Sequence, residues 1–126
     1  MTKKIVATDK APAAVGAYSQ GVITNGLVFC SGQVPLDPAT GELIGGSIED
    51  ETRRCLDNLS AVLEEAGSSW DRVVKATVYL IDINDFAAFN GVYAGYVGES
   101  PPARAAFAVA GLPKGARIEI ECVAEV

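Results

Sequence analysis

The stretch Arg117-Ile118-Glu119-Ile120-Glu121-Cys122-Val123-Ala124 alternates charged and apolar side chains over most of its length. A period of two residues is the pattern of a β-strand, in which successive side chains point to opposite faces of a sheet. The isoleucines and the cysteine therefore point one way, and the carboxylates of Glu119 and Glu121 point the other way. This strand is the clearest structural signal in the chain.

Further strands and helices are predicted upstream of this strand. Asn25-Gly26 is typical of a two-residue hairpin turn, because both positions tolerate a positive φ. A capping box begins at Ser47, apolar residues then recur at helical spacing, and Gly67 ends that helix. The chain of 126 residues is long enough for one domain, residues 1–126, with a single core. The predicted strands lie at 3–8, 22–24, 27–31, 73–81, 103–110 and 117–124, and the predicted helices at 47–67 and 82–97.

The composition limits the partners that are expected. Sixteen acidic and ten basic side chains give a net charge of −6, which disfavours binding to the phosphate backbone of nucleic acids. No long apolar segment follows the N-terminal lysines, so we expect no signal peptide, no membrane span and a cytoplasmic location. Apolar residues make up 49% of the chain and charged residues 21%, which indicates that another subunit covers part of the surface.

Histidine is absent from the chain, and its cysteines are few and far apart. Without histidine, the chain cannot form a Ser-His-Asp or Cys-His pair or a histidine-ligated zinc site. Cys30, Cys55 and Cys122 show no Cys-X-X-Cys spacing, and we expect them to be buried, reduced thiols. We therefore expect no metal and no cofactor, and chemistry that uses carboxylates, hydroxyls, Lys, Arg, backbone amides and water.

Arg104 is the one charged residue in an otherwise small and apolar stretch, residues 101–113. An arginine stays protonated inside a protein, so its guanidinium needs an anion or a set of carbonyl oxygens. If residues 103–110 form an antiparallel hairpin with the last strand, a glutamate of that strand is the partner in an ion pair. The alternative partner is a small organic acid, because the same-face neighbours Ala106 and Ala108 leave space beside the guanidinium. Both interpretations stay open at this point.

Other positions also allow two interpretations. Tyr18 lies in a loop and is either a lid over the core or a phenol that takes part in binding or catalysis. Ser31-Gly32 is either a plain strand terminus or the source of a backbone amide for a ligand. Asn90 in the second helix is a candidate for holding a loop. A stripe at helical spacing is assigned to the core: Phe86, Phe89 and Tyr93.

Several motifs spread along the chain carry a resemblance to a known family. They are residues 11–21 (APAAVGAYSQG), 31–35 (SGQVP), 84–86 (NDF) with Asn90, 102–107 (PARAAF) and 112–121 (LPKGARIEIE). Together and in this order, they resemble the RidA family, which is also called YjgF or L-PSP. The resemblance covers nearly the whole chain, and the ordered set is far more specific than any single motif.

The resemblance implies a fold, an assembly and an activity. The fold is α+β and chorismate-mutase-like, with a mixed sheet of about six strands packed on two helices. The assembly is a homotrimer with active sites in the clefts between subunits. The activity is metal-independent hydrolysis of reactive enamines and imines, such as 2-iminobutanoate and 2-iminopropanoate, to 2-oxo acids and ammonia.

The resemblance also assigns roles by position. Arg104 corresponds to the arginine that binds the substrate carboxylate, Glu119 to the residue that positions water, and Tyr18 to a further catalytic contact. When no ligand is bound, we expect carbonyl oxygens, water or a buffer anion to hold the arginine. The remaining substrate-binding positions are Ser31, Gly32, Ala106, Phe107 and Asn90.

Other activities and some departures from the family pattern belong to the same resemblance. The family has been described as an endoribonuclease that inhibits translation and as a holdase chaperone, and a non-catalytic regulator that binds small 2-oxo acids would use the same arginine. The negative charge and the lack of histidine disfavour RNA cleavage. The chain has Ala105-Ala106 where many bacterial members have Ser-Cys, Ala17 where proline is usual, and Pro101 where an aromatic or other apolar residue is common.

Overall fold

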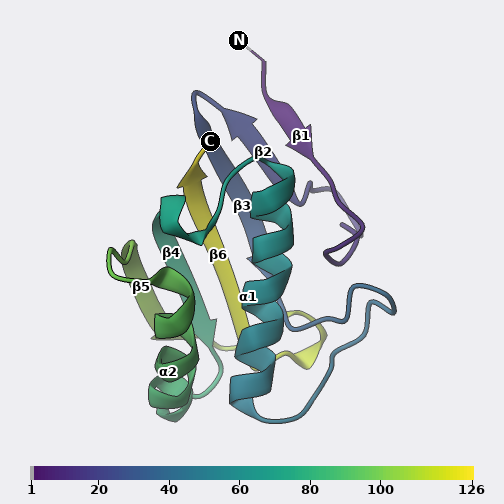
Figure 1. The fold of residues 1–126 in the computed structure, drawn as a ribbon. Helices are drawn as coiled ribbons and strands as arrows, with labels where there is room; N and C mark the ends of the chain where they lie inside the picture. The colour runs from purple at the N-terminus through teal and green to yellow at the C-terminus, as the bar shows by residue number, and fades with distance from the viewer. Residues whose placement is uncertain (1) are drawn as a thin grey trace.

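In residues 2–126, which the computed structural model describes, six strands form one sheet and two helices cover one of its faces (Figure 1). Every predicted strand and helix is present, with ends shifted by a few residues, and the second helix is preceded by a short 3-10 helix at Ile83–Asp85. The elements are β1 (Lys4–Val6), β2 (Gly21–Thr24), β3 (Leu27–Gln33), α1 (Ile48–Glu65), β4 (Val73–Leu80), α2 (Phe86–Val97), β5 (Ala103–Ala108) and β6 (Ile118–Glu125).

The last strand of the chain lies in the middle of the sheet. The strand order is β1-β2-β3-β6-β4-β5, with β6 antiparallel to both of its neighbours and β5 parallel to β4 at the edge. The expected hairpin between β5 and β6 is therefore wrong. Because α2 connects β4 to β5, the chain crosses over and returns parallel to the strand it left, so β5 lies on the side of β4 away from β6.

The alternation along β6 sorts its side chains as the sequence predicts. Ile118 and Ile120 are fully buried beneath the helices, whereas Glu119 and Glu121 are half-buried on the opposite face. Because β6 has a paired strand on each side, it lies away from both edges of the sheet. The core on the helix side is completed by the buried apolar residues of α1, namely Ile48, Cys55, Leu56, Leu59, Val62 and Leu63.

Local signals in the sequence set the limits of α1. The Ser47 hydroxyl accepts a hydrogen bond from the Asp50 N–H at 3.1 Å, and this N-cap begins the helix as predicted. The helix ends just before Gly67, whose φ of +83° favours glycine. Midway along the helix, the buried Asn58 amide donates to the Leu36 carbonyl at 3.0 Å and holds the segment that follows β3. Neither α1 nor α2, the helices of the described residues, has both the length and the apolar character needed to cross a membrane.

The cysteines match their prediction. Cys30, Cys55 and Cys122 are buried, and none of them forms a disulfide in the part of the chain that the structure describes. Cys30 and Cys122 are direct cross-strand partners in β3 and β6. A hydrogen bond with Cys30, together with burial, raises the pKa of the Cys122 thiol well above its ordinary value, so this thiol stays protonated.

Candidate functional site

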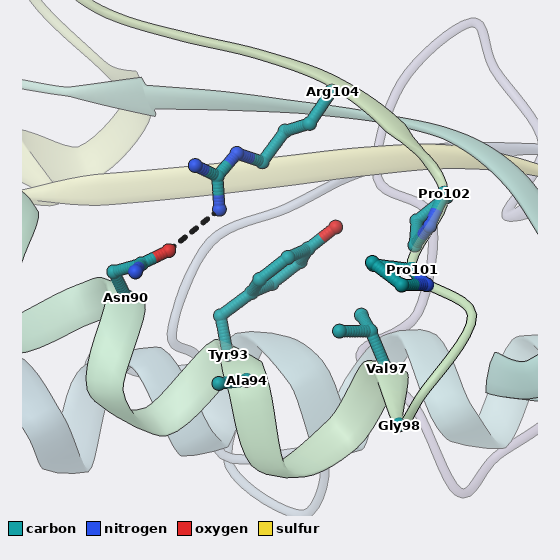
Figure 2. Close-up of a pocket in the computed structure, with 8 residues that line it drawn as sticks. All are labelled: Asn90, Tyr93, Ala94, Val97, Gly98, Pro101, Pro102 and Arg104. Atoms are coloured by element: carbon teal, nitrogen blue, oxygen red, sulfur yellow. Dashed lines mark hydrogen bonds between the residues drawn. The ribbon is translucent and has the colours of Figure 1, made fainter.

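Arg104 lies on the edge strand β5, on the side of the sheet that the helices cover. It is in register with the fully buried Ala76 of β4, so the Arg104 side chain extends toward α2 (Figure 2). Its Nη1 donates a hydrogen bond to the side-chain carbonyl oxygen Oδ1 of Asn90 at 2.7 Å. A carbonyl oxygen, one of the partners that we expected, thus holds the guanidinium, and Asn90 holds the arginine rather than a loop.

Aromatic rings of α2 surround the other side of the guanidinium. Its central carbon lies 5.2 Å from the ring centroid of Phe86, 5.7 Å from that of Phe89 and 5.1 Å from that of Tyr93. These are cation–π distances, at which the electron-rich faces of the rings stabilise a positive charge. The core assignment of this stripe is confirmed, since Phe89 and Tyr93 are buried and Phe86 packs against them. The sequence did not indicate that the stripe also supports Arg104.

Among residues 2–126, no salt bridge joins Arg104 to a carboxylate. The cross-strand ion pair with Glu119 or Glu121 is wrong, because β4 lies between β5 and β6 and the side chains point to opposite faces. An amide oxygen and aromatic rings neutralise the charge less completely than a carboxylate does. The guanidinium therefore remains available for an external anion.

A surface pocket of about 410 Å³ opens beside the guanidinium, between α2 and the segment that leads into β5 (Figure 2). It is lined by Pro101 and not by Ala106, which is half-buried against the core. The Tyr93 hydroxyl is buried here without a hydrogen-bond partner among the described residues, and burial raises the pKa of this phenol. The pocket is lined by Asn90, Tyr93, Ala94, Val97, Gly98, Pro101, Pro102 and Arg104.

Glu119 lies on the opposite face of the sheet, where its carboxyl group rests against Gly32. A Cβ atom built on Gly32 would overlap the Glu119 carboxyl group, so any larger residue at position 32 would force this side chain out of its place. Gly32 belongs to a β-bulge, because Cys30 pairs with Cys122 while Gln33 pairs with Ile120. Bulges of this kind redirect side chains and are common beside active sites. Ser31-Gly32 therefore forms a bulge inside β3 and is not a plain strand terminus, which was one of the two interpretations that the sequence allowed.

The surroundings of Glu119 favour the protonated acid more than bulk water does. Burial, followed by the charge of Glu121, raises the pKa of the Glu119 carboxyl above its usual value. The hydroxyl of Tyr79 on β4 donates to the Glu121 carboxylate, and this hydrogen bond is the main cause that raises the pKa of Tyr79 to about 12. Arg104 is not a cause of the Glu119 shift, consistent with its place on the other face of the sheet.

Tyr18 lies in the loop that precedes β2, and 53% of its surface is exposed, so it is no lid over the core of this chain. The loop is fastened to the bulge through Ser31, whose hydroxyl donates to the Ser19 carbonyl at 2.6 Å. The Ser31 N–H donates to the Gln20 carbonyl at 2.9 Å. Both hydrogen-bond donors of Ser31 are thus occupied within the chain.

Phe107 lies on the same face of the sheet as Glu119, which is the face that the helices leave uncovered. Its ring packs edge-on against Tyr79, with the centroids 5.4 Å apart, and 45% of its surface is exposed.

Most of the predicted site residues form two separate groups. We call Arg104, Asn90 and the supporting rings of Phe86, Phe89 and Tyr93 the arginine half-site. We call Glu119, Gly32, Ser31 and Tyr18 the glutamate half-site. Within residues 2–126, no group of three or more Cys, Asp or Glu residues is placed to hold a metal ion.

Comparison with known proteins identifies the family. The family model described as Endoribonuclease L-PSP matches residues 8–126. A 2-iminobutanoate/2-iminopropanoate deaminase of Bos taurus is 49% identical over 98% of this chain and 90% of its own length. A RutC family protein of Pyrococcus abyssi is 50% identical over 98% of both chains.

Solved structures agree with this result. The crystal structure of Escherichia coli TdcF with bound serine superposes with a TM-score of 0.91, at 40% identity and over 98% of both chains. The sheet with its helices on one face is the α+β, chorismate-mutase-like fold that the motifs implied. The match over residues 8–126, the identity to curated relatives and the shared fold lead to one conclusion: the chain belongs to the RidA family, also called YjgF or L-PSP.

Proposed function

We propose that the protein hydrolyses 2-imino acids, with 2-iminobutanoate and 2-iminopropanoate as substrates, to 2-oxo acids and ammonia. The observation that carries the proposal is Arg104, a fixed guanidinium without a carboxylate partner among residues 2–126, beside a pocket. A 2-imino acid offers the carboxylate that such a guanidinium binds in a bidentate way. The deaminase name of the Bos taurus relative and the serine bound to TdcF support a small carboxylate ligand.

We further propose that the protein works as a homotrimer, in which the arginine half-site of one subunit meets the glutamate half-site of the next. The half-sites lie on opposite faces of one sheet, so a single chain does not bring Arg104 and Glu119 together. The uncovered face also exposes large apolar side chains, including Phe29 and Phe107. Exposed apolar patches of this kind favour burial against another subunit.

In the proposed reaction, Arg104 holds the substrate carboxylate and leaves the C=N carbon open to water. Glu119 accepts a proton from the attacking water, and the new C–O bond forms as the C=N π electrons move to nitrogen. Glu119 returns this proton to the nitrogen, which gives a neutral carbinolamine. It then takes the proton of the new hydroxyl group and passes it to the nitrogen, so that the C–N bond breaks, the carbonyl forms and ammonia leaves. The Tyr18 hydroxyl orients the nitrogen. General acid–base catalysis of this type contributes about 10² to 10⁴-fold.

The environment of Glu119 suits this double role. A general base works best when its pKa is close to the working pH, because it must both take and return a proton. Burial and Glu121 shift the pKa of Glu119 in that direction. Gly32 fixes the position of the carboxyl group by leaving space for it. An electrophilic imine needs no covalent nucleophile, so the proposed reaction uses water alone.

A regulator that binds 2-oxo acids without turnover is the alternative that the same arginine supports. Such a protein needs the arginine half-site but has no use for Glu119 as a base. Replacing Glu119 with Ala therefore separates the two functions, since a regulator still binds 2-oxobutanoate whereas the enzyme stops turning over. RNA cleavage, which the family name suggests, has less support because the chain carries a net charge of −6.

Arg104→Ala tests the central residue of the proposal. We expect the loss of two charge-assisted hydrogen bonds to lower kcat/KM for 2-iminobutanoate at least about 100-fold. The imine is generated by a threonine dehydratase in the assay and trapped by semicarbazide, so that hydrolysis competes with trapping. Arg53→Ala, which removes an exposed arginine from a surface ion pair on α1, is the matched control. Wild-type rates in Arg104→Ala would rule out this role for Arg104.

Gly32→Ala tests whether the position of Glu119 matters. The added Cβ would overlap the Glu119 carboxyl group, which must move away. We expect kcat to fall about 10 to 100-fold, because general-base catalysis depends on precise placement. Gly111→Ala serves as the control, since its Cβ would meet no heavy atom within 4 Å. An unchanged kcat, together with a displaced carboxyl group in the crystal structure of the variant, contradicts the role of Glu119.

Glu121→Gln tests the electrostatics of Glu119 through the pH profile. Glu119 acts as a base when ionised, so kcat/KM falls as the pH drops through its pKa. The charge of Glu121 is the second cause that raises this pKa, after burial. Its removal should therefore move the acidic limb of the profile to lower pH. Glu125→Gln, at the exposed end of the same strand, should leave the limb in place. A limb that stays put or moves to higher pH in Glu121→Gln argues against the assignment.

A further inference from the structure

The loop that carries Tyr18 is anchored by buried and partly buried hydrogen bonds that have no role in the reaction described above. We propose that Gln20 and Ser31 form a clamp that positions Tyr18 for imine hydrolysis, and that neither residue contacts the substrate. The inference rests on the proposed function and deepens it. Gln20 thereby has a positioning role, and Ser31 acts in positioning and not in substrate binding.

The side chain of Gln20 closes the loop on itself. Gln20 is 4% exposed. Oε1 accepts a hydrogen bond from the Thr8 N–H at 2.7 Å, while Nε2 donates to the carbonyls of Thr8 at 2.9 Å and Pro12 at 2.8 Å. A glutamine is suited to this task because its amide carries both an acceptor and two donors. The start of the loop is therefore tied to its end, immediately beside Tyr18.

Ser31 ties the end of the loop to the sheet. Its hydroxyl donates to the Ser19 carbonyl at 2.6 Å, and its N–H donates to the Gln20 carbonyl at 2.9 Å. Ser31 is also the bulge residue next to Gly32, which leaves room for the Glu119 carboxyl group. One bulge thus fixes both the proposed base and the residue that precedes Gln20, so Tyr18 and Glu119 share a common anchor.

Tyr18 itself makes little use of the core for its position. It is 53% exposed, and its ring atoms lie within 3.9 Å of a Cβ built on Gly16, a residue of the same loop. An exposed side chain on an untied loop samples many conformations, and fixing it costs conformational entropy. The clamp fixes the loop when the protein folds, before substrate binds. The entropy of ordering Tyr18 is then not lost during the reaction, which is how positioning residues raise a catalytic rate.

A double-mutant cycle between Ser31→Ala and Tyr18→Phe tests the clamp. We expect each single variant to lower kcat about 10 to 100-fold, with the dissociation constant for 2-oxobutanoate unchanged. In the Tyr18→Phe background, Ser31→Ala should cause no further loss, since residues that act through one another are not additive. Gln20→Glu places a carboxylate against carbonyl oxygens and should reproduce the pattern. Ser68→Ala, which removes a buried hydroxyl bound to the Glu125 carbonyl, is the control.

The outcomes separate the clamp from the proposed function. Additive losses in the double variant, or weaker binding of 2-oxobutanoate to Ser31→Ala, overturn the clamp while leaving the enzyme in place. Hydrogen exchange adds a readout that needs no activity: amides of residues 13–19 should exchange faster in Ser31→Ala than in the wild type, and equal rates overturn the clamp. A wild-type protein without turnover overturns the proposed function and the catalytic role of the clamp together.

Discussion

The alternation of side chains along β6 determines how the whole candidate site is arranged. In a strand, neighbouring residues point to opposite faces. Because Ile118 and Ile120 are buried beneath the helices, the Glu119 side chain points to the uncovered face. Arg104 is in register with the buried Ala76 of β4, so its side chain points to the face that α2 covers. One sheet separates these side chains, and no rotamer change brings them together. The chemistry proposed for this family member therefore depends on a second subunit.

The contacts of Arg104 are consistent with a site that needs a second subunit. Arg104 is held by an amide oxygen and by aromatic rings, which fix its direction without neutralising it. A carboxylate in the place of Asn90 would form a stable ion pair and compete with a ligand. On the other face, the carboxyl group of Glu119 is half-buried beside Glu121, an environment that favours proton uptake. In the proposed function, each half-site meets a partner that the single chain does not supply.

Local sequence patterns predicted most of the fold. The alternation of β6, the turn at Asn25-Gly26 and the cap at Ser47 each depend on a few neighbouring residues, and each was found where predicted. The predicted pairing of β5 with β6 was wrong. The short connection between these strands favours a hairpin, but the helical crossover through α2 places β5 parallel to β4. Strand partners depend on the topology of the whole chain, which local spacing does not encode.

The candidate site shows the same limit. Motif resemblance selected Arg104, Glu119 and Tyr18, but it did not indicate that the first two lie on opposite faces. The partner of Arg104 had a signal in hindsight, because Asn90 follows Phe86 by four residues and so shares its helix face. The bulge at Ser31-Gly32 had none, since the extra residue in β3 is defined only by its pairing with β6.

Subunit complementation tests the central claim most directly, namely that Arg104 and Glu119 of different subunits form one site. Arg104→Ala and Glu119→Gln are each expected to be inactive, and they are mixed in equal amounts, unfolded and refolded together. If each site takes Arg104 from one subunit and Glu119 from the next, random assembly leaves both residues intact in about a quarter of the sites. The account predicts recovery of about a quarter of the wild-type rate. A mixture that exchanges subunits, verified by mass spectrometry, yet stays inactive would contradict it.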